Sequence, residues 1–128
     1  MSEIAIDRPQ ATPTAFSVLS AAGFCHMLND TMQSVFLAAY PIFKGNFDLS
    51  FAQIGLLTLT YQATGSLLQP LVGLYTDRRP LPYSLPFGMG SSLAGLMMLA
   101  FAQSYAMLLV GAVMLGMGSS VFHPEASR

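Results

Sequence analysis

Charged side chains are scarce in this sequence, since five Lys and Arg and six Asp and Glu make up 9% of its 128 residues. A soluble domain carries about 25% charged residues, and a nucleic-acid-binding protein needs a basic surface that neutralises phosphates. Both classes are therefore excluded. Disorder is excluded as well, because 53% of the residues are hydrophobic. The single cysteine, Cys25, rules out an internal disulfide or a cysteine-based metal site.

The few charges divide the chain into long uncharged stretches, at residues 9–29, 31–43, 49–76 and 80–124. The last stretch would form about 68 Å of helix, which is close to two crossings of a hydrocarbon core about 30 Å thick. We therefore predict an all-α integral membrane fold with four transmembrane helices, at about 15–40, 51–75, 83–102 and 105–125. A turn after the first span is expected from Pro41, Lys44, Gly45 and Asn46. Asp48 or Ser50 is expected to cap the second helix.

Residues 1–14 carry both signs of charge and two prolines, and we expect them to form a short tail before the first span. They resemble no cleavable signal peptide, because a positively charged start and a small-residue cleavage site are lacking. Positive charges in short loops mark the cytoplasmic side of a membrane protein. One predicted side carries Arg8, Arg78, Arg79 and Arg128, whereas the other carries only Lys44. The N-terminal tail is therefore predicted to be cytoplasmic.

Small residues recur every four positions along the predicted spans. Ser84, Gly88 and Ser92 form one such series, and Ala112 and Gly116 begin another. Transmembrane helices associate through close backbone approach and polar contacts rather than through hydrophobicity. These positions are expected to pack helix against helix. Tyr61 stands out because it lies near the middle of its span, whereas the other four tyrosines lie at span ends.

Four polar residues interrupt the first span: His26, Asn29, Asp30 and Gln33. At 100° per residue they share a helix face roughly 100° wide. An ionisable residue near the bilayer centre costs about 2.5–3.5 kcal/mol or more, so it usually faces a water-filled cavity or a partner. We expect a proton-coupling or substrate-binding face, in which His26 shares or relays the proton of Asp30. The alternative is a structural hydrogen-bond group that ties the first span to its neighbours.

The end of the chain combines three further polar residues, His123, Glu125 and Arg128. Pro124 removes a backbone donor and is expected to kink the helix. One interpretation is a solvated helix end, in which Glu125 and Arg128 pair across three residues. In the other, all three side chains face the cavity and Arg128 binds an anionic group with two hydrogen bonds.

A loop motif connects the second and third spans, in the residues Gly73-Leu-Tyr-Thr-Asp77-Arg78-Arg79. It resembles the G-x-x-x-D-R/K signature of the major facilitator superfamily at the same place between spans. Pro80, Leu81 and Pro82 depart from the glycine and further basic residues that commonly follow in that family. Three longer segments are similar to the fosmidomycin-resistance proteins within this superfamily, namely FCHMLNDTMQSVFLAAYPIF, FAQIGLLTLTYQATGSLLQPLVGLYTD and GSSVFHPEASR.

The resemblance implies a secondary transporter of the bacterial inner membrane that exports a small anionic drug in exchange for protons. It also implies that Gly73, Asp77 and Arg78 hold an inner gate shut. Transporters of this family have two six-helix halves, and the resemblance implies that the chain is the N-terminal third of such a transporter. Its expected partners are the lipid bilayer, a small-molecule substrate, protons and further transporter helices. We expect neither cofactor nor metal.

An enzyme is not expected, since the sequence contains no G-x-x-x-x-G-K-[ST], H-E-x-x-H or G-x-S-x-G motif. Two alternatives remain open at this point. One is a small four-span multidrug exporter that acts as a dimer and uses Asp30 as its proton carboxylate. The other is a membrane subunit that transports nothing.

Overall fold

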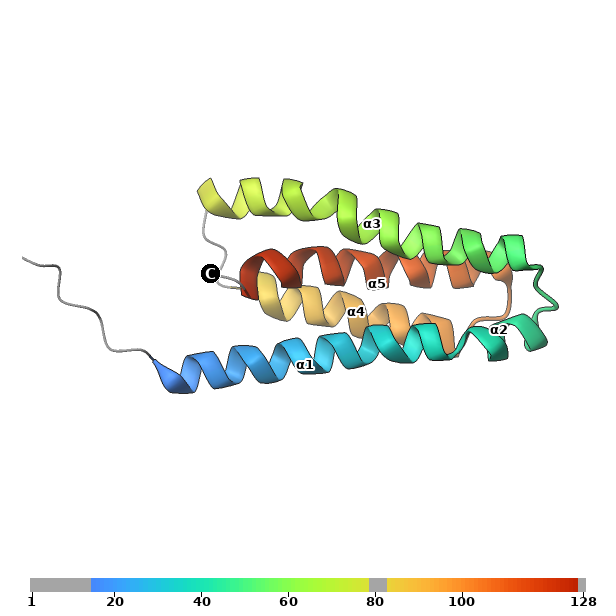
Figure 1. Cartoon of the computed structure of the whole chain (residues 1–128), viewed down its shortest axis with the longest axis horizontal. Coiled ribbons are helices and arrows are strands. Elements are labelled where there is room, and N and C mark those ends of the chain that lie inside the picture. Colours follow the sequence, from blue (N-terminus) through green and yellow to red (C-terminus); the bar gives the residue numbers. More distant parts are fainter. Residues whose placement is uncertain (1–14, 79–82, 127–128) are drawn as a thin grey trace, which may run out of the picture.

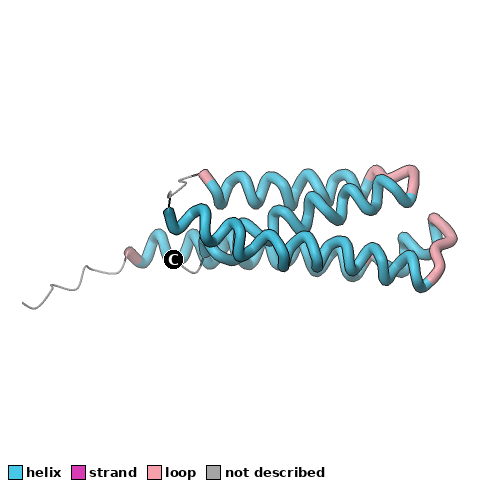
Figure 2. Tube along the Cα trace, turned by 90° about the horizontal axis from the view of Figure 1, so that it is seen from above, coloured by secondary structure: helices cyan, strands magenta, loops and turns pink. Residues whose placement is uncertain are grey.

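The computed structural model describes residues 15–78 and 83–126, and there it consists of helices without a strand. Five helices follow one another: α1 (Phe16–Ala38), α2 (Tyr40–Asn46), α3 (Phe51–Arg78), α4 (Ser84–Ala100) and α5 (Tyr105–Ala126). The four long helices run side by side and form one elongated bundle (Figures 1 and 2). The predicted all-α architecture is confirmed for this part of the chain.

The turn after α1 differs from the prediction. Pro41, Lys44, Gly45 and Asn46 all lie within α2, so the predicted turn at these residues is wrong. Proline is tolerated in the first turn of a helix because the N–H that it lacks would have no partner there. The chain turns instead over the four residues before α3.

The start of α3 is held by reciprocal hydrogen bonds, as one of the two predicted caps requires. The backbone N–H of Ser50 donates to Oε1 of Gln53 at 2.9 Å, and the N–H of Gln53 donates to Oγ of Ser50 at 3.2 Å. This is a capping box, which satisfies two N–H groups at once. Ser50 is therefore the cap, whereas Asp48 takes the left-handed backbone conformation of the turn, at a φ of 50°.

Helix α5 lies at the centre of the bundle, with α3 and α4 packed against it (Figure 1). Glycines make this packing close. A Cβ atom on Gly116 would lie 2.6 Å from the carbonyl oxygen of Tyr61 in α3, and one on Gly118 would lie 2.7 Å from the backbone nitrogen of Ser92 in α4. Ser84, Gly88 and Ser92 are all buried. The predicted role of these small residues in helix packing is confirmed.

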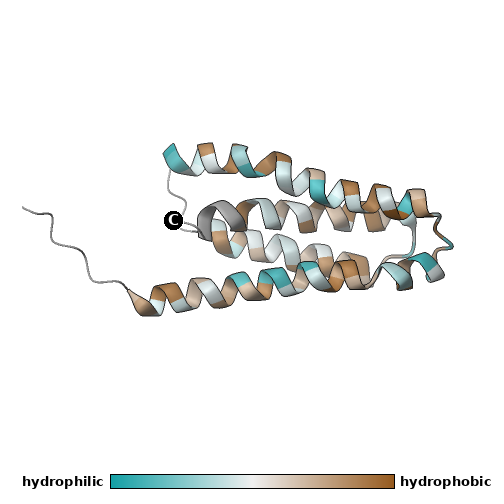
Figure 3. Ribbon diagram, in the orientation of Figure 1, coloured by the Kyte–Doolittle hydropathy of each residue, from teal (hydrophilic) through white to brown (hydrophobic). Residues whose placement is uncertain are grey.

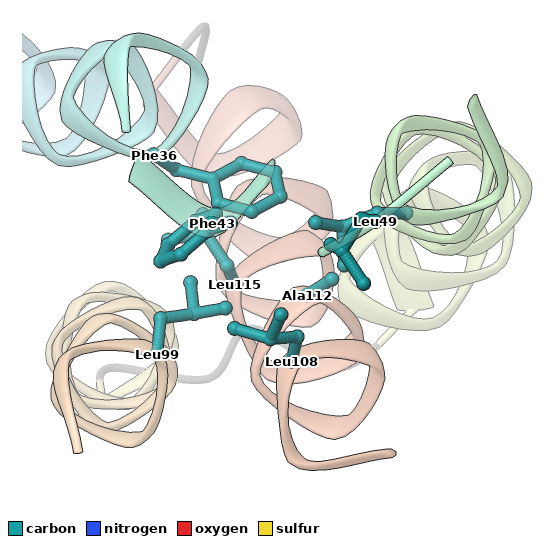
Figure 4. Close-up of a cluster of buried hydrophobic side chains, with 8 residues drawn as sticks. Phe36, Phe43, Leu49, Leu99, Leu108, Ala112 and Leu115 are labelled. Carbon is teal, nitrogen blue, oxygen red and sulfur yellow. The ribbon is translucent and has the colours of Figure 1, made fainter. Parts of the chain in front are cut away.

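An apolar core fills the end of the bundle beside α2 (Figure 4). Its largest members are Phe36 and Phe43, from α1 and α2, with leucines from α3, α4 and α5 around them. Phe36 also contacts Tyr61 edge-on, at 5.3 Å between ring centroids. This core holds α1 and α2 against the other helices at one end.

Large apolar side chains also cover the outside of the bundle, among them Phe16, Leu67 and Phe87, which are 74%, 70% and 66% exposed. Hydrophobic residues recur along the coloured parts of the long helices, with polar bands on α1 and α3 (Figure 3). Among the described residues, one helix is both long and apolar enough to cross a membrane, with the segment Tyr105–Phe122; the apolar helix Ser84–Ala100 is shorter. The four predicted membrane crossings stay predictions.

Candidate functional site

Asn29 belongs to the predicted polar face and is fully buried between helices. Its side chain is 0% exposed. The hydroxyl of Ser92, in α4, donates a hydrogen bond to Oδ1 of Asn29 at 2.9 Å. The side-chain oxygen of Asn29 thereby ties α1 to α4, 63 residues further along the chain.

Gln33 follows one turn later and joins α1 to two other helices. Its Oε1 accepts a short hydrogen bond from the hydroxyl of Tyr61 in α3. The same oxygen accepts a second hydrogen bond, of 3.4 Å, from the hydroxyl of Ser119 in α5. One amide oxygen thus connects three helices.

Both amides leave their nitrogen ends without a hydrogen-bond partner among the described residues. Nδ2 of Asn29 and Nε2 of Gln33 are buried, and neither has an acceptor. A buried donor left unpaired costs about 1–3 kcal/mol, and most buried polar groups in proteins are paired. Two such donors one helical turn apart make this face of α1 the candidate site.

His26 and Asp30 form an ion pair at the edge of this face. Nε2 of His26 lies 3.5 Å from Oδ2 of Asp30, and the two side chains are 39% and 53% exposed. The imidazole also stacks on Phe122 of α5, with 5.5 Å between ring centroids and 26° between planes. The ring of His26 is therefore held against α5, whereas about half of the Asp30 side chain is exposed.

An aromatic cluster closes the face toward α2. Tyr40 contacts Phe36 edge-on at 5.1 Å, and its hydroxyl accepts a 2.9 Å hydrogen bond from Thr58 of α3. The bond between Tyr61 and Gln33 joins α1 to α3, and the bond between Thr58 and Tyr40 joins α2 to α3. The polar face is accordingly bounded by apolar rings at one end.

The predicted face is thus divided. His26 and Asp30 are partly exposed, whereas Asn29 and Gln33 turn toward the other helices. Sequence reasoning placed Ser92 among packing residues and missed that Ser92 and Ser119 bind the two amides. The mid-span position of Tyr61 was the signal that could have found its role.

The loop motif lies elsewhere, at the opposite end of α3 from Ser50. Gly73, Asp77 and Arg78 all belong to the last turns of α3 rather than to a loop. Asp77 and Arg78 are exposed and Gly73 is half-buried. Between them, Thr76 is buried, and its hydroxyl donates to the carbonyl oxygen of Val72 at 3.0 Å. Two charged side chains therefore project from a helix end, separate from the polar face of α1.

A comparison with protein-family models decides the family. Residues 19–128 match the model of the Major Facilitator Superfamily. The chain belongs to the major facilitator superfamily. Members of this superfamily are transporters, so the expected absence of enzymatic activity agrees with the match.

Two curated relatives in the superfamily are similar along nearly the whole chain. The fosmidomycin resistance protein of Escherichia coli (strain K12) is 52% identical over 115 residues, which are 90% of this chain and 28% of the relative. An uncharacterized MFS-type transporter of Bacillus subtilis (strain 168) is 41% identical over 128 residues, which are 100% of this chain and 31% of that relative. The chain thus spans about three-tenths of their lengths. Comparison with solved structures gives no significant match.

The remaining candidate residues of this superfamily member lie outside the described side chains. His123 and Glu125 belong to the last turns of α5, whose side chains are not described there, and Arg128 lies beyond the described residues. Their place in a cavity stays a prediction. Among the described residues, no group of three His, Cys, Asp or Glu side chains could hold a metal ion.

Proposed function

We propose that this chain forms part of a proton-coupled secondary transporter in the bacterial inner membrane, which exports a small, fosmidomycin-like anionic compound. The pair of His26 and Asp30 is the observation that carries the proposal, because it lies on the one helix face that also presents two buried amides. Membership of the superfamily and the 52% identity to a fosmidomycin resistance protein support transport of this kind.

Asp30 is proposed as the proton carrier. A carboxylate inside a membrane span is costly unless it reaches water or a partner, so such residues are usually functional. Asp30 has such a partner, since His26 lies 3.5 Å away, and about half of its side chain is exposed. Protonation of the carboxylate and deprotonation of the imidazole would then weaken the pair. The polar face of α1 could then exchange its contacts for others.

The ends of the helices are proposed to serve gating and anion binding. Asp77 and Arg78 project from the end of α3, where they can pair with charges of an opposing helix and latch the cytoplasmic side. Gly73 would allow such a helix to approach closely. Arg128, with His123 and Glu125, is proposed to face the cavity, because a guanidinium binds oxyanions with two parallel hydrogen bonds.

The test measures fosmidomycin transport by the full-length protein in proteoliposomes with an imposed pH gradient. Asp30→Asn keeps the shape of the side chain but cannot release a proton, so we expect pH-driven transport to fall by at least about tenfold, as for loss of an acid-base group. Asp48→Asn is the matched control, because Asp48 lies in the turn before α3 and asparagine also tolerates its positive φ.

Transport that stays pH-driven in Asp30→Asn would contradict the role of Asp30. Absence of any fosmidomycin movement by the unmodified protein would contradict the transport function itself. The alternatives of a dimeric four-span exporter and of a subunit without transport are separated by the detergent-solubilised mass together with the same assay.

A further inference from the structure

We propose that the amide nitrogens of Asn29 and Gln33 form a donor pair that binds acceptor oxygens of the transported ligand, and that Ser92, Ser119 and Tyr61 position this pair. The inference rests on the proposed transport function and names the binding chemistry of the same face. The ligand class is a neutral or anionic compound with at least two acceptor oxygens, rather than a cation.

The orientation of both amides is set from neighbouring helices. Hydroxyl donors hold the oxygen of each amide: Ser92 holds Asn29, and Tyr61 with Ser119 holds Gln33. An amide whose oxygen accepts these bonds must direct its N–H2 group the other way. Because Asn29 and Gln33 are four residues apart, their side chains lie above one another on the same helix face.

The nitrogen ends of the two amides indicate which chemical class of ligand can bind. An amide N–H2 group only donates hydrogen bonds, and Nδ2 of Asn29 and Nε2 of Gln33 have no acceptor among the described residues. Their natural complement is a group rich in lone pairs, such as a phosphonate or carboxylate. A quaternary cation offers no acceptor and would gain nothing from these two donors.

The donors are enclosed in this conformation, so a ligand reaches them when α1 separates from α4 and α5. The packing of α1 allows this movement. Glycine contacts lock α3 and α4 to α5, whereas Gly23 in α1 has no atom within 4 Å of where a Cβ would stand. Near the polar face, α1 is held by the hydrogen bonds of Asn29 and Gln33. A ligand that takes over these amides therefore competes with the closed arrangement.

Proton transfer and ligand binding are divided between neighbouring residues in this arrangement. His26 and Asp30 pair with each other at the exposed edge, whereas Asn29 and Gln33 point inward without charge. Substitution of the amides should therefore change affinity for the ligand, and substitution of Asp30 should change the response to the pH gradient. The two roles can be measured separately.

The experiment measures the dissociation constant of fosmidomycin for the purified full-length protein by isothermal titration calorimetry. Gln33→Met and Asn29→Leu keep roughly the shape of each side chain but remove the donors, and we expect each to raise Kd at least about tenfold, the effect of one charge-assisted hydrogen bond. Tetraphenylphosphonium, a cation without acceptor oxygens, serves as the second probe. Its Kd should not depend on either amide.

A smaller substitution tests whether Ser92 positions the amide of Asn29, and the adjacent serine of α4 serves as its control. Ser92→Ala frees the oxygen of Asn29 to turn, so we expect Kd to rise several-fold, by roughly one neutral hydrogen bond. Ser91→Ala is the matched control, because the Ser91 hydroxyl donates to the carbonyl oxygen of Met114 in α5 at 2.8 Å and touches neither amide. A merely structural role would make the two variants equal.

Equal Kd values for Ser92→Ala and Ser91→Ala, an unchanged Kd in Gln33→Met, or no binding of fosmidomycin by the unmodified protein would each overturn the donor pair. Weakened binding in the amide variants, with no transport in proteoliposomes, would uphold the donor pair and contradict the transport function. If the amide variants bind fosmidomycin with wild-type affinity and still transport it, the transport function is upheld and the donor pair is contradicted.

Discussion

Asn29 and Asp30 are neighbours in the chain, yet Asn29 is 0% exposed and the Asp30 side chain is 53% exposed. Consecutive residues on a helix point about 100° apart. One side chain can therefore meet another helix while its neighbour in the chain stays exposed. At the scale of single residues, the polar face of α1 therefore contains two environments. Buried amides bind hydroxyls of other helices, and an ion pair lies at the edge.

Tyr61 allows the contribution of a single hydrogen bond to be tested. Tyr61→Phe removes the hydrogen bond to Gln33 but keeps the edge contact with Phe36. Hydrogen bonds between membrane helices contribute about 0.6 kcal/mol on average and up to about 1.7 kcal/mol. We expect a loss of unfolding free energy in this range, measured by denaturant titration in detergent. Tyr75→Phe is the control, since Tyr75 is 54% exposed, and it should change stability less.

At the scale of elements, the helices differ in how they are joined. Helices α3 and α4 each approach α5 at glycines, where backbone atoms leave no room for a Cβ. Helix α1 instead contacts them through amide and aromatic side chains. Close backbone packing resists displacement because it has one geometry, whereas side-chain bonds can be exchanged for bonds to a ligand.

A glycine substitution tests this difference. Gly116→Ala would place its Cβ 2.6 Å from the carbonyl oxygen of Tyr61 and 2.9 Å from Cβ of Thr64. Overpacking of this kind costs about 1–3 kcal/mol, so the midpoint of unfolding should fall. Gly90→Ala is the matched control, because nothing lies within 4 Å of the added atom. Equal stability of the two variants would show that α3 and α5 are not tightly joined.

At the scale of the whole molecule, the described charged side chains other than Asp30 lie near the two ends of the bundle. Helix α3 ends at Arg78 at the same end as the start of α1, and α2 with Lys44 lies at the opposite end (Figure 1). This arrangement suits a chain that crosses a membrane with its arginine-bearing end in the cytoplasm. The orientation itself stays a prediction.

Cysteine labelling in intact cells checks the orientation. In a Cys25→Ser background, Asn46→Cys should react with a membrane-impermeant maleimide added from outside, because Asn46 ends α2 and is exposed. Thr12→Cys, in the N-terminal tail, should react only after the membrane is opened. Reaction of Thr12→Cys from outside would reverse the topology.

Much of the helical architecture was predictable because it depends on local properties. The capping role of Ser50 and the packing role of Gly88 and Gly116 follow from residue type and spacing. The turn after α1 was predicted wrongly, since Pro41 and Gly45 are compatible with a helix start and a short helix as well as with a turn. Local preference could not distinguish these, and the burial of Phe43 in the core favours the helix.

The sequence by itself determined that the chain is helical, poor in charge and a member of the major facilitator superfamily, because apolar runs and short motifs are readable residue by residue. Only the tertiary structure decided how the polar residues of α1 divide their roles. The partners of Asn29 and Gln33 lie on α3, α4 and α5 and are brought to them by the glycine contacts of those helices. The direction of each of these side chains and its hydrogen-bond partner depend on the neighbouring helices. The local sequence of α1 does not contain that information.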